Sequence, residues 1–124
     1  MRLGSTCEEV EKESGIPHTT TSARRTELRA NDYTKYAYIT DADGKRRIMR
    51  RRTDSGKTAA VELATEKGKR AIRNGSAIVV RGDDPTRGYH GGNPMSEDAY
   101  HGVDRSEARR IVLGIMVKYT PEDE

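Results

Sequence analysis

The densest chemical feature of this sequence is a run of positive charge between positions 45 and 52. Six of these eight residues are basic: Lys45, Arg46, Arg47, Arg50, Arg51 and Arg52. Acidic residues concentrate elsewhere, so the run is locally basic although the formal net charge of the chain is only +3. Lysine and arginine grouped on one element neutralise phosphates, and the run therefore predicts a polyphosphate-binding surface. The alternative interpretation is a solvated charged surface without a partner.

A second feature that could contact nucleic acid is a row of hydroxyl groups at positions 19–22, followed by Arg24. Small hydroxyl side chains early in a helix allow close approach to phosphates and base edges, and arginine can donate two hydrogen bonds to guanine. We expect four residues to face the major groove, with Arg24 reading a guanine: Thr19, Thr20, Ser22 and Arg24. We expect the other cations to contact phosphates: Arg29, Lys35 and the six residues of the basic run. The alternative is that the hydroxyls only cap the helix.

Three further patterns could indicate enzymatic or metal chemistry, and each is incomplete. The segment at 55–58 ends like a phosphate-binding P-loop, but Arg51 stands where its first glycine should be, so a turn is the better interpretation. Cys7 has no base near it in the sequence and is expected to pack as a small apolar residue. Histidines and carboxylates at positions 83–101, including His90 and His101, lack the spacing of a metal site. We therefore expect no enzyme, no catalytic residue, no metal and no cofactor.

The elements that would position these side chains begin with two short helices. Thr6 followed three residues later by Glu9 predicts a capping box, and Gly15 predicts the end of that helix. A second helix is expected from about His18 or Thr19 to Ala30. Two helices joined by a tight glycine-containing turn are typical of a helix-turn-helix motif.

A basic hairpin is expected next. Residues 33–40 are rich in strand formers, residues 41–44 predict a turn, and residues 45–52 predict the return strand. After a turn at 54–56, residues 58–64 could be strand or helix, whereas 66–73 predict a helix and 77–80 a strand. Ser106 or Asp104 should cap a C-terminal helix with apolar residues at helical spacing: Ala108, Ile111, Val112, Ile115 and Met116.

Composition is consistent with one small domain that has a thin core. Hydrophobic residues make up 32% of the chain and charged residues 35%, and Phe and Trp are absent, so a partner subunit or DNA is expected to supplement the core. The single cysteine excludes an internal disulfide. The sequence has no apolar run of membrane-spanning length, and we expect a cytoplasmic protein without a membrane partner.

These motifs, in this order, resemble small winged helix-turn-helix proteins of bacteriophages. The matching segments lie in about the first half of the chain: Thr6-Cys7-Glu8-Glu9-Val10-Glu11, residues 15–24, Glu27-Leu28 and Arg52-Thr53-Asp54-Ser55-Gly56. The resemblance implies an α+β winged helix-turn-helix that binds double-stranded DNA. We expect sequence-specific or semi-specific binding, by a transcription regulator or DNA-metabolism accessory protein in the host cytoplasm. The alternative is a phage protein-binding module that inhibits a host polymerase or nuclease, or a virion component.

Two features depart from these relatives. Arg25 stands where they have an apolar residue, so we expect it to pair with a carboxylate of the first helix, or the second helix to be rotated. The relatives also have a stretch like residues 90–96 and a helix before the Thr6-Cys7 motif, whereas here both follow it. We therefore predict a permuted or swapped arrangement: a core at 1–80, a glycine-rich arm at 81–104, and a helix at 105–119 that packs on this core or on a second copy in a homodimer.

Overall fold

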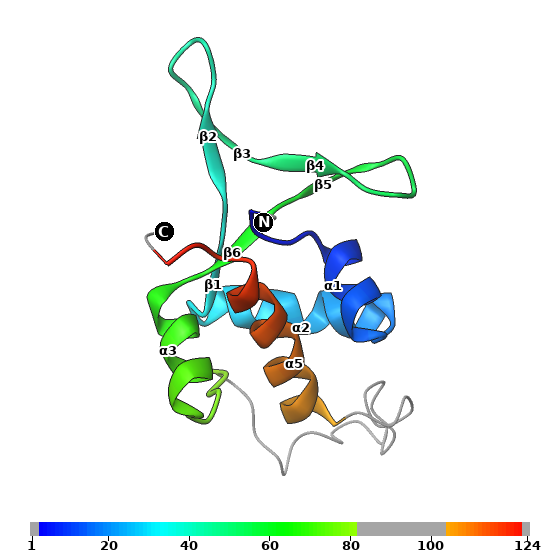
Figure 1. The fold of residues 1–124 in the computed structure, drawn as a ribbon, viewed down its shortest axis with the longest axis vertical. Helices are drawn as coiled ribbons and strands as arrows, with labels where there is room; N and C mark the ends of the chain where they lie inside the picture. The colour runs from blue at the N-terminus through cyan, green and yellow to red at the C-terminus, as the bar shows by residue number, and fades with distance from the viewer. Residues whose placement is uncertain (1–2, 82–103, 123–124) are drawn as a thin grey trace.

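The computed structural model describes residues 3–81 and 104–122. Residues 82–103, which are most of the predicted arm at 81–104 and include the candidate metal ligands His90 and His101, lie outside the described residues. The described chain is α+β, as predicted, with a helical body from which β-strands extend (Figure 1). The helices are α1 (Cys7–Ser14), α2 (His18–Ala30), α3 (Glu66–Asn74) and α5 (Arg105–Lys118). The strands are β1 (Thr34–Tyr36), β2 (Tyr38–Thr40), β3 (Arg46–Ile48), β4 (Arg50–Arg52), β5 (Thr58–Ala60) and β6 (Glu62–Ala64).

The first two helices have the boundaries that the sequence predicts. The Thr6 hydroxyl accepts a hydrogen bond from the Glu9 amide (3.3 Å), and the Glu9 carboxylate accepts one from the Thr6 amide (2.9 Å), which completes the capping box. Gly15 ends α1 with φ of 76°, a left-handed conformation that glycine adopts without steric cost. Pro17 then precedes α2, so the two helices are joined by three residues.

The strands form three two-stranded antiparallel sheets that meet at one junction (Figure 1). β1 pairs with β6, β2 with β3, and β4 with β5. At the centre, the amide of Ala37 donates to the carbonyl of Val61 (2.9 Å), that of Val61 to Met49 (2.9 Å), and that of Met49 to Ala37 (2.8 Å). Each of the segments 34–40, 46–52 and 58–64 pairs with one neighbour before this point and with another neighbour after it. The closed ring of three hydrogen bonds satisfies the backbone groups at the point where the pairing changes.

This junction corrects the prediction of one basic hairpin. Residues 46–48 pair back on β2, but residues 50–52 turn away and pair with β5, so the basic run is divided between two hairpins. Ala37 and Val61 are buried at the junction with Leu63, and Met49 packs against them. The apolar residues at which the strands change partner therefore form a small second core. The sequence is compatible with either strand or helix at residues 58–64, and the structure has the strands β5 and β6 there.

α5 completes the main core within the same chain. Asp104 is its cap, because the Asp104 carboxylate accepts from the Glu107 amide (2.7 Å). The buried apolar residues of α5 lie in one cluster with Val10 of α1, Leu28 of α2 and Ile16 of the turn between these helices: Ala108, Val112, Leu113, Ile115 and Met116. Because these side chains are buried here, they are not exposed for a second copy of the chain.

Residues 77–80 correct another prediction, because they form no strand. The Val79 amide donates to the Tyr33 hydroxyl (2.9 Å), and the Arg81 amide donates to the Asn31 side chain (2.7 Å). The segment is therefore held by side chains of the loop between α2 and β1, and not by hydrogen bonds to a neighbouring strand. The predicted helix before it is confirmed as α3, which Gly75 ends at φ of 66°.

Two helical glycines provide a matched test of this packing. A Cβ atom at Gly68 of α3 would lie 2.2 Å from the Tyr33 carbonyl oxygen, whereas one at Gly114 of α5 would meet nothing within 4 Å. We expect Gly68→Ala to lower the free energy of unfolding by about 1–3 kcal/mol through overpacking. Gly114→Ala should raise it by about 0.5–1 kcal/mol, because alanine is the better helix former. Urea denaturation checks both, and equal effects of the same sign would contradict the packing described here.

Candidate nucleic-acid interface

The outer face of α2 presents small hydroxyl side chains. Thr19 and Thr26 are exposed and Ser22 is half-buried, and the three lie on one face because their spacing follows the helical repeat. The Thr26 hydroxyl donates to the carbonyl of Ser22 (3.0 Å). This face is the part of α2 that a DNA groove could approach.

Two of the four residues predicted to read bases point into the protein, so this part of the prediction is wrong. Thr20 is 1% exposed and Arg24 is 7% exposed. The guanidinium of Arg24 lies 2.7 Å from the Glu27 carboxylate, which also accepts two hydrogen bonds from Arg109 of α5 (2.9 and 3.1 Å). Arg24 therefore holds α2 to α5 instead of reading guanine.

Arg25 is paired, but with a different partner from the one predicted. Its guanidinium donates to Glu62 of β6, and no rotation of α2 is needed. Glu62 is 1% exposed and also accepts from Arg29 (3.0 Å) and from the Thr34 hydroxyl (3.3 Å). Arg29 stacks over the Tyr36 ring, 4.7 Å from its centroid. One buried carboxylate thus fixes α2 against the strands that lead to the hairpins.

The hairpin of β2 and β3 is built around Asp41 in its turn. The Asp41 carboxylate accepts from the Lys45 amide (2.9 Å) and from the Arg47 guanidinium (2.6 Å). The hydrogen bond from the Lys45 amide, supported by that of Arg47, lowers the pKa of the Asp41 carboxyl. Arg46 stacks on the ring of Tyr38, 3.9 Å from its centroid. The turn therefore orders a cationic hairpin without burying its cations.

The hairpin of β4 and β5 is attached to α1 by Arg51. Its guanidinium donates twice to the Glu9 carboxylate (2.8 and 2.6 Å) and also to the carbonyls of Leu3 (3.0 Å) and Gly4 (3.1 Å). The carboxylate of Glu8 accepts from the backbone of the turn at 53–57 (3.0 Å). The prediction that Arg51 contacts phosphate is corrected, because its donors are used to hold the hairpin in place.

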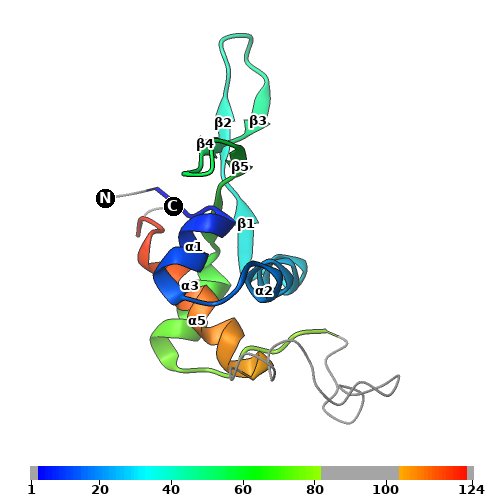
Figure 2. The ribbon, with the colours of Figure 1, turned by 90° about the vertical axis from the view of Figure 1, so that its right-hand side faces the viewer.

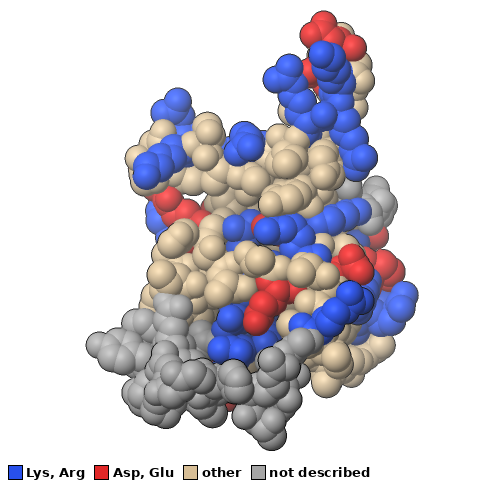
Figure 3. All heavy atoms as spheres, turned by 180° about the vertical axis from the view of Figure 1, so that it is seen from behind, with Lys and Arg blue, Asp and Glu red and all other residues tan. Residues whose placement is uncertain are grey.

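Most of the other residues that were predicted to contact DNA lie at the surface. Of the twelve predicted residues, seven are exposed: Thr19, Lys35, Lys45, Arg46, Arg47, Arg50 and Arg52. α2 lies on the side of the helical body that faces away from the viewer in Figure 1, and the hairpins lie above it (Figure 2). Viewed from that side, lysine and arginine side chains gather on both hairpins and in a band beneath them (Figure 3). The hydroxyl face and the cationic hairpins therefore share one side of the molecule.

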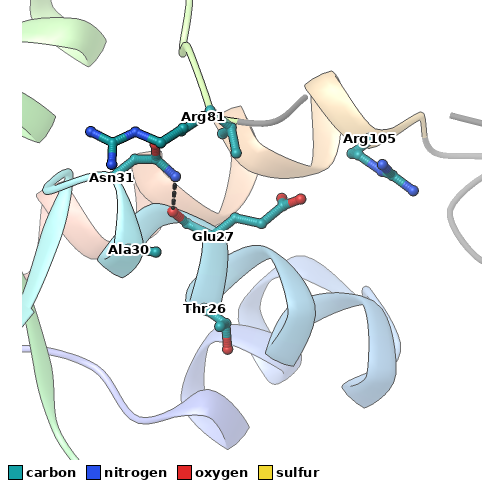
Figure 4. Close-up of a pocket in the computed structure, with 7 residues that line it drawn as sticks. Thr26, Glu27, Ala30, Asn31, Arg81 and Arg105 are labelled. Atoms are coloured by element: carbon teal, nitrogen blue, oxygen red, sulfur yellow. Dashed lines mark hydrogen bonds between the residues drawn. The ribbon is translucent and has the colours of Figure 1, made fainter. Parts of the chain in front are cut away.

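A small hollow lies beside the end of α2. It has a volume of about 260 Å³ and is lined by Thr26, Glu27, Ala30, Asn31, Val80, Arg81 and Arg105 (Figure 4). Ligand pockets usually enclose about 300–1,000 Å³. The Glu27 carboxylate already binds Arg109, and the Asn31 amide donates to the Glu27 carbonyl (2.8 Å), so these two polar side chains hold the fold together.

The structure also brings together three residues that the sequence analysis did not connect. Cys7 and Glu11 lie one turn apart on α1, and His18 begins α2 across the tight turn. The Cys7 sulfur lies 3.1 Å from Glu11 Oε2 and 3.7 Å from His18 Nδ1. The expectation that Cys7 has no base nearby is therefore wrong. The i, i+4 spacing of Cys7 and Glu11 was visible in the sequence, but the approach of His18 depends on the angle between the helices.

Comparison of the chain with protein-family models, with curated proteins and with solved structures finds no match. Among the described residues, none of the helices combines the length and the apolar character needed to cross a membrane.

Proposed function

We propose that this protein binds duplex DNA through the outer face of α2 and the two hairpins, as a phage-type transcription regulator or DNA-metabolism accessory protein without catalytic activity. The observation that carries the proposal is that α2, whose outer face bears hydroxyl groups, lies on the same side of the molecule as the two cationic hairpins (Figures 2 and 3). Phosphate contacts position a protein on DNA, and short polar side chains on a helix reach base edges.

In this proposal the fold is a permuted winged helix-turn-helix. α1 and α2 are the helix-turn-helix, β1 and β6 are the strands beside it, and α5 takes the place of the helix that precedes the motif in the phage relatives. Support comes from the contacts of α5 with α1 and α2, and from Ser5, whose amide and carbonyl both pair with Glu62 (2.9 Å each). Ser5 thereby forms an isolated antiparallel bridge beside β6.

The binding mode follows from which side chains are accessible. Thr19, Ser22 and Thr26 face the major groove, and sequence reading is modest because Arg24 is buried. Six exposed cations reach phosphates on either side of the groove: Lys35, Lys45, Arg46, Arg47, Arg50 and Arg52. Arg29 is held by Glu62 and is not counted, so the surface makes about six phosphate contacts.

A salt series tests the proposal. Six phosphate contacts predict that log K falls with log salt concentration at a slope of about −5, from about −0.9 per contact. Replacing Arg46, Arg50 and Arg52 by alanine removes three contacts, so the slope should fall to about −2 to −3 and the affinity should drop. Fluorescence anisotropy with a labelled duplex measures both.

The matched control removes three exposed arginines outside this surface: Arg70, Arg73 and Arg110. This variant has the same net charge as the hairpin variant, and we expect it to keep the wild-type slope. Absence of duplex binding at about 50 mM salt, or equal losses in the two triple variants, would overturn the proposal.

A further inference from the structure

The three ligand-type side chains at the α1–α2 turn form a compact group. Cys7 Sγ, Glu11 Oε2 and His18 Nδ1 all lie within 4.8 Å of one another, and the Glu11 oxygen is 2.6 Å from the histidine nitrogen. Cys7 and Glu11 are half-buried, whereas the His18 side chain is 68% exposed. The group therefore lies at the surface, where an ion and water can reach it.

Sulfur, imidazole nitrogen and carboxylate oxygen are the ligands that zinc prefers. Bonds of about 2.3 Å to sulfur and about 2.0–2.2 Å to nitrogen or oxygen place the ligands of a tetrahedral zinc about 3.3–3.8 Å apart. The separation of the sulfur from the histidine nitrogen (3.7 Å) falls within this range, whereas its separation from the Glu11 oxygen (3.1 Å) is slightly shorter. The Glu11 oxygen must therefore move away from both His18 Nδ1 and the sulfur, which a rotation of the Glu11 side chain allows.

The local fold holds the ligands in this arrangement. The capping box fixes the start of α1, which places Cys7 at its first position and Glu11 one turn later on the same face. The left-handed Gly15 reverses the chain, and the Ser14 hydroxyl accepts from the Ile16 amide (3.0 Å), which orders the turn. His18, as the first residue of α2, is thereby held against α1.

A cation can bind here only if the neighbouring charges do not repel it. Arg25 lies close enough to Cys7 to act on the thiol, but its charge is balanced by Glu62. Burial, and then the hydrogen bond to Glu11, raise the pKa of the Cys7 thiol to about 11. The thiol must therefore release one proton to solvent as sulfur bonds to the ion.

We propose that Cys7, Glu11 and His18 bind one divalent transition-metal ion of the zinc class, with water as the fourth ligand. The ion would join the first turn of α1 to the first residue of α2 and make the turn between the two helices rigid. This site does not depend on the proposed DNA binding.

Cobalt(II) is the probe that tests the site, because a thiolate bound to cobalt gives a charge-transfer absorption in the near ultraviolet. Cys7 is the only cysteine in the chain, so this band can come from no other residue. The full chain, prepared without a polyhistidine tag, should take up one cobalt ion with the band, and zinc should displace it. Zinc should also raise the thermal midpoint of the wild type.

Three variants and one control decide the assignment. Cys7→Ser should lose the band, and His18→Gln and Glu11→Gln should each weaken cobalt binding by at least about tenfold, since even outer-shell changes cost that much. The control is His90→Gln with His101→Gln, which should bind cobalt as the wild type does. Circular dichroism confirms that each variant is folded.

Two results would overturn the metal site. One is the absence of a thiolate band in the wild type at millimolar cobalt. The other is an unchanged cobalt affinity in His18→Gln, which would mean that the three residues do not act together. The titration contains no DNA, so its failure leaves the proposed function untouched, and loss of DNA binding leaves the metal site untouched.

Discussion

The double variant Ser22→Asp, Thr26→Asp should bind duplex DNA at least about 100-fold more weakly than the wild type. In the proposed complex these positions lie in the groove, so each new carboxylate would face phosphates or base edges at close range. Like charges brought together in an interface cost several kcal/mol, and 1.4 kcal/mol corresponds to a factor of ten. Thr26 is exposed and Ser22 half-buried, so the stability should change little.

Anisotropy titration at fixed salt measures this loss of affinity. The matched control is Arg70→Ala with Arg73→Ala, which lowers the net charge by the same two units on α3, on the side of the molecule away from α2 (Figure 2). We expect the control to bind within about threefold of the wild type, because exposed charges farther than a Debye length of about 10 Å are screened. If the control loses as much affinity as the α2 variant, only overall charge matters and α2 does not enter the groove.

The helix boundaries were predictable because their signals are local. Thr6, Glu9 and Gly15 act on backbone groups within four residues of themselves, and the structure shows the same capping box and the same left-handed stop. The two glycine turns of the hairpins are equally local, with φ of 80° at Gly44 and 89° at Gly56.

The strand partners were not predictable from local signals. Strand formers and turns predicted one hairpin, whereas the structure contains a three-way junction in which the residues after Met49 change partner. The sequence does contain a trace of this arrangement, since Ala37, Met49 and Val61 are each twelve residues apart. Pairing of β1 with β6 depends on how the whole segment between them folds, and no short window contains that information.

The face of α2 was partly readable from the sequence. Counting back by four residues from Leu28, the only leucine of α2, gives Arg24 and then Thr20, so the helical repeat places all three on one face. Charge argued against that placement for Arg24. Arg24 can be buried because it shares the Glu27 carboxylate with Arg109 in one ion-pair network. Arg109 is 82 residues from Glu27, so no pattern in the sequence near α2 could indicate this partner.

Glu62→Gln should lower the free energy of unfolding by about 3 kcal/mol. Glu62 is 1% exposed and accepts from Arg25 and Arg29, so the neutral amide would leave two arginines without their counterion. Removing one partner of a buried ion pair typically costs about 3–5 kcal/mol. The lower end applies here because the Arg29 side chain is 31% exposed and can still be hydrated. Small domains have only about 5–15 kcal/mol in total, so the variant should be close to unfolding.

Urea denaturation followed by circular dichroism gives the change, with the slope m held common to all variants. Glu66→Gln is the matched control, because Glu66 is 61% exposed and 3.6 Å from Arg73, and it should change stability by no more than about 0.5 kcal/mol. The double variant Arg25→Met, Glu62→Leu should recover part of the loss, since apolar residues of similar volume can replace a buried ion pair. If Glu62→Gln is no more damaging than the control, the buried carboxylate does not hold α2 against the strands, and the fixed geometry on which the proposed DNA surface depends is lost.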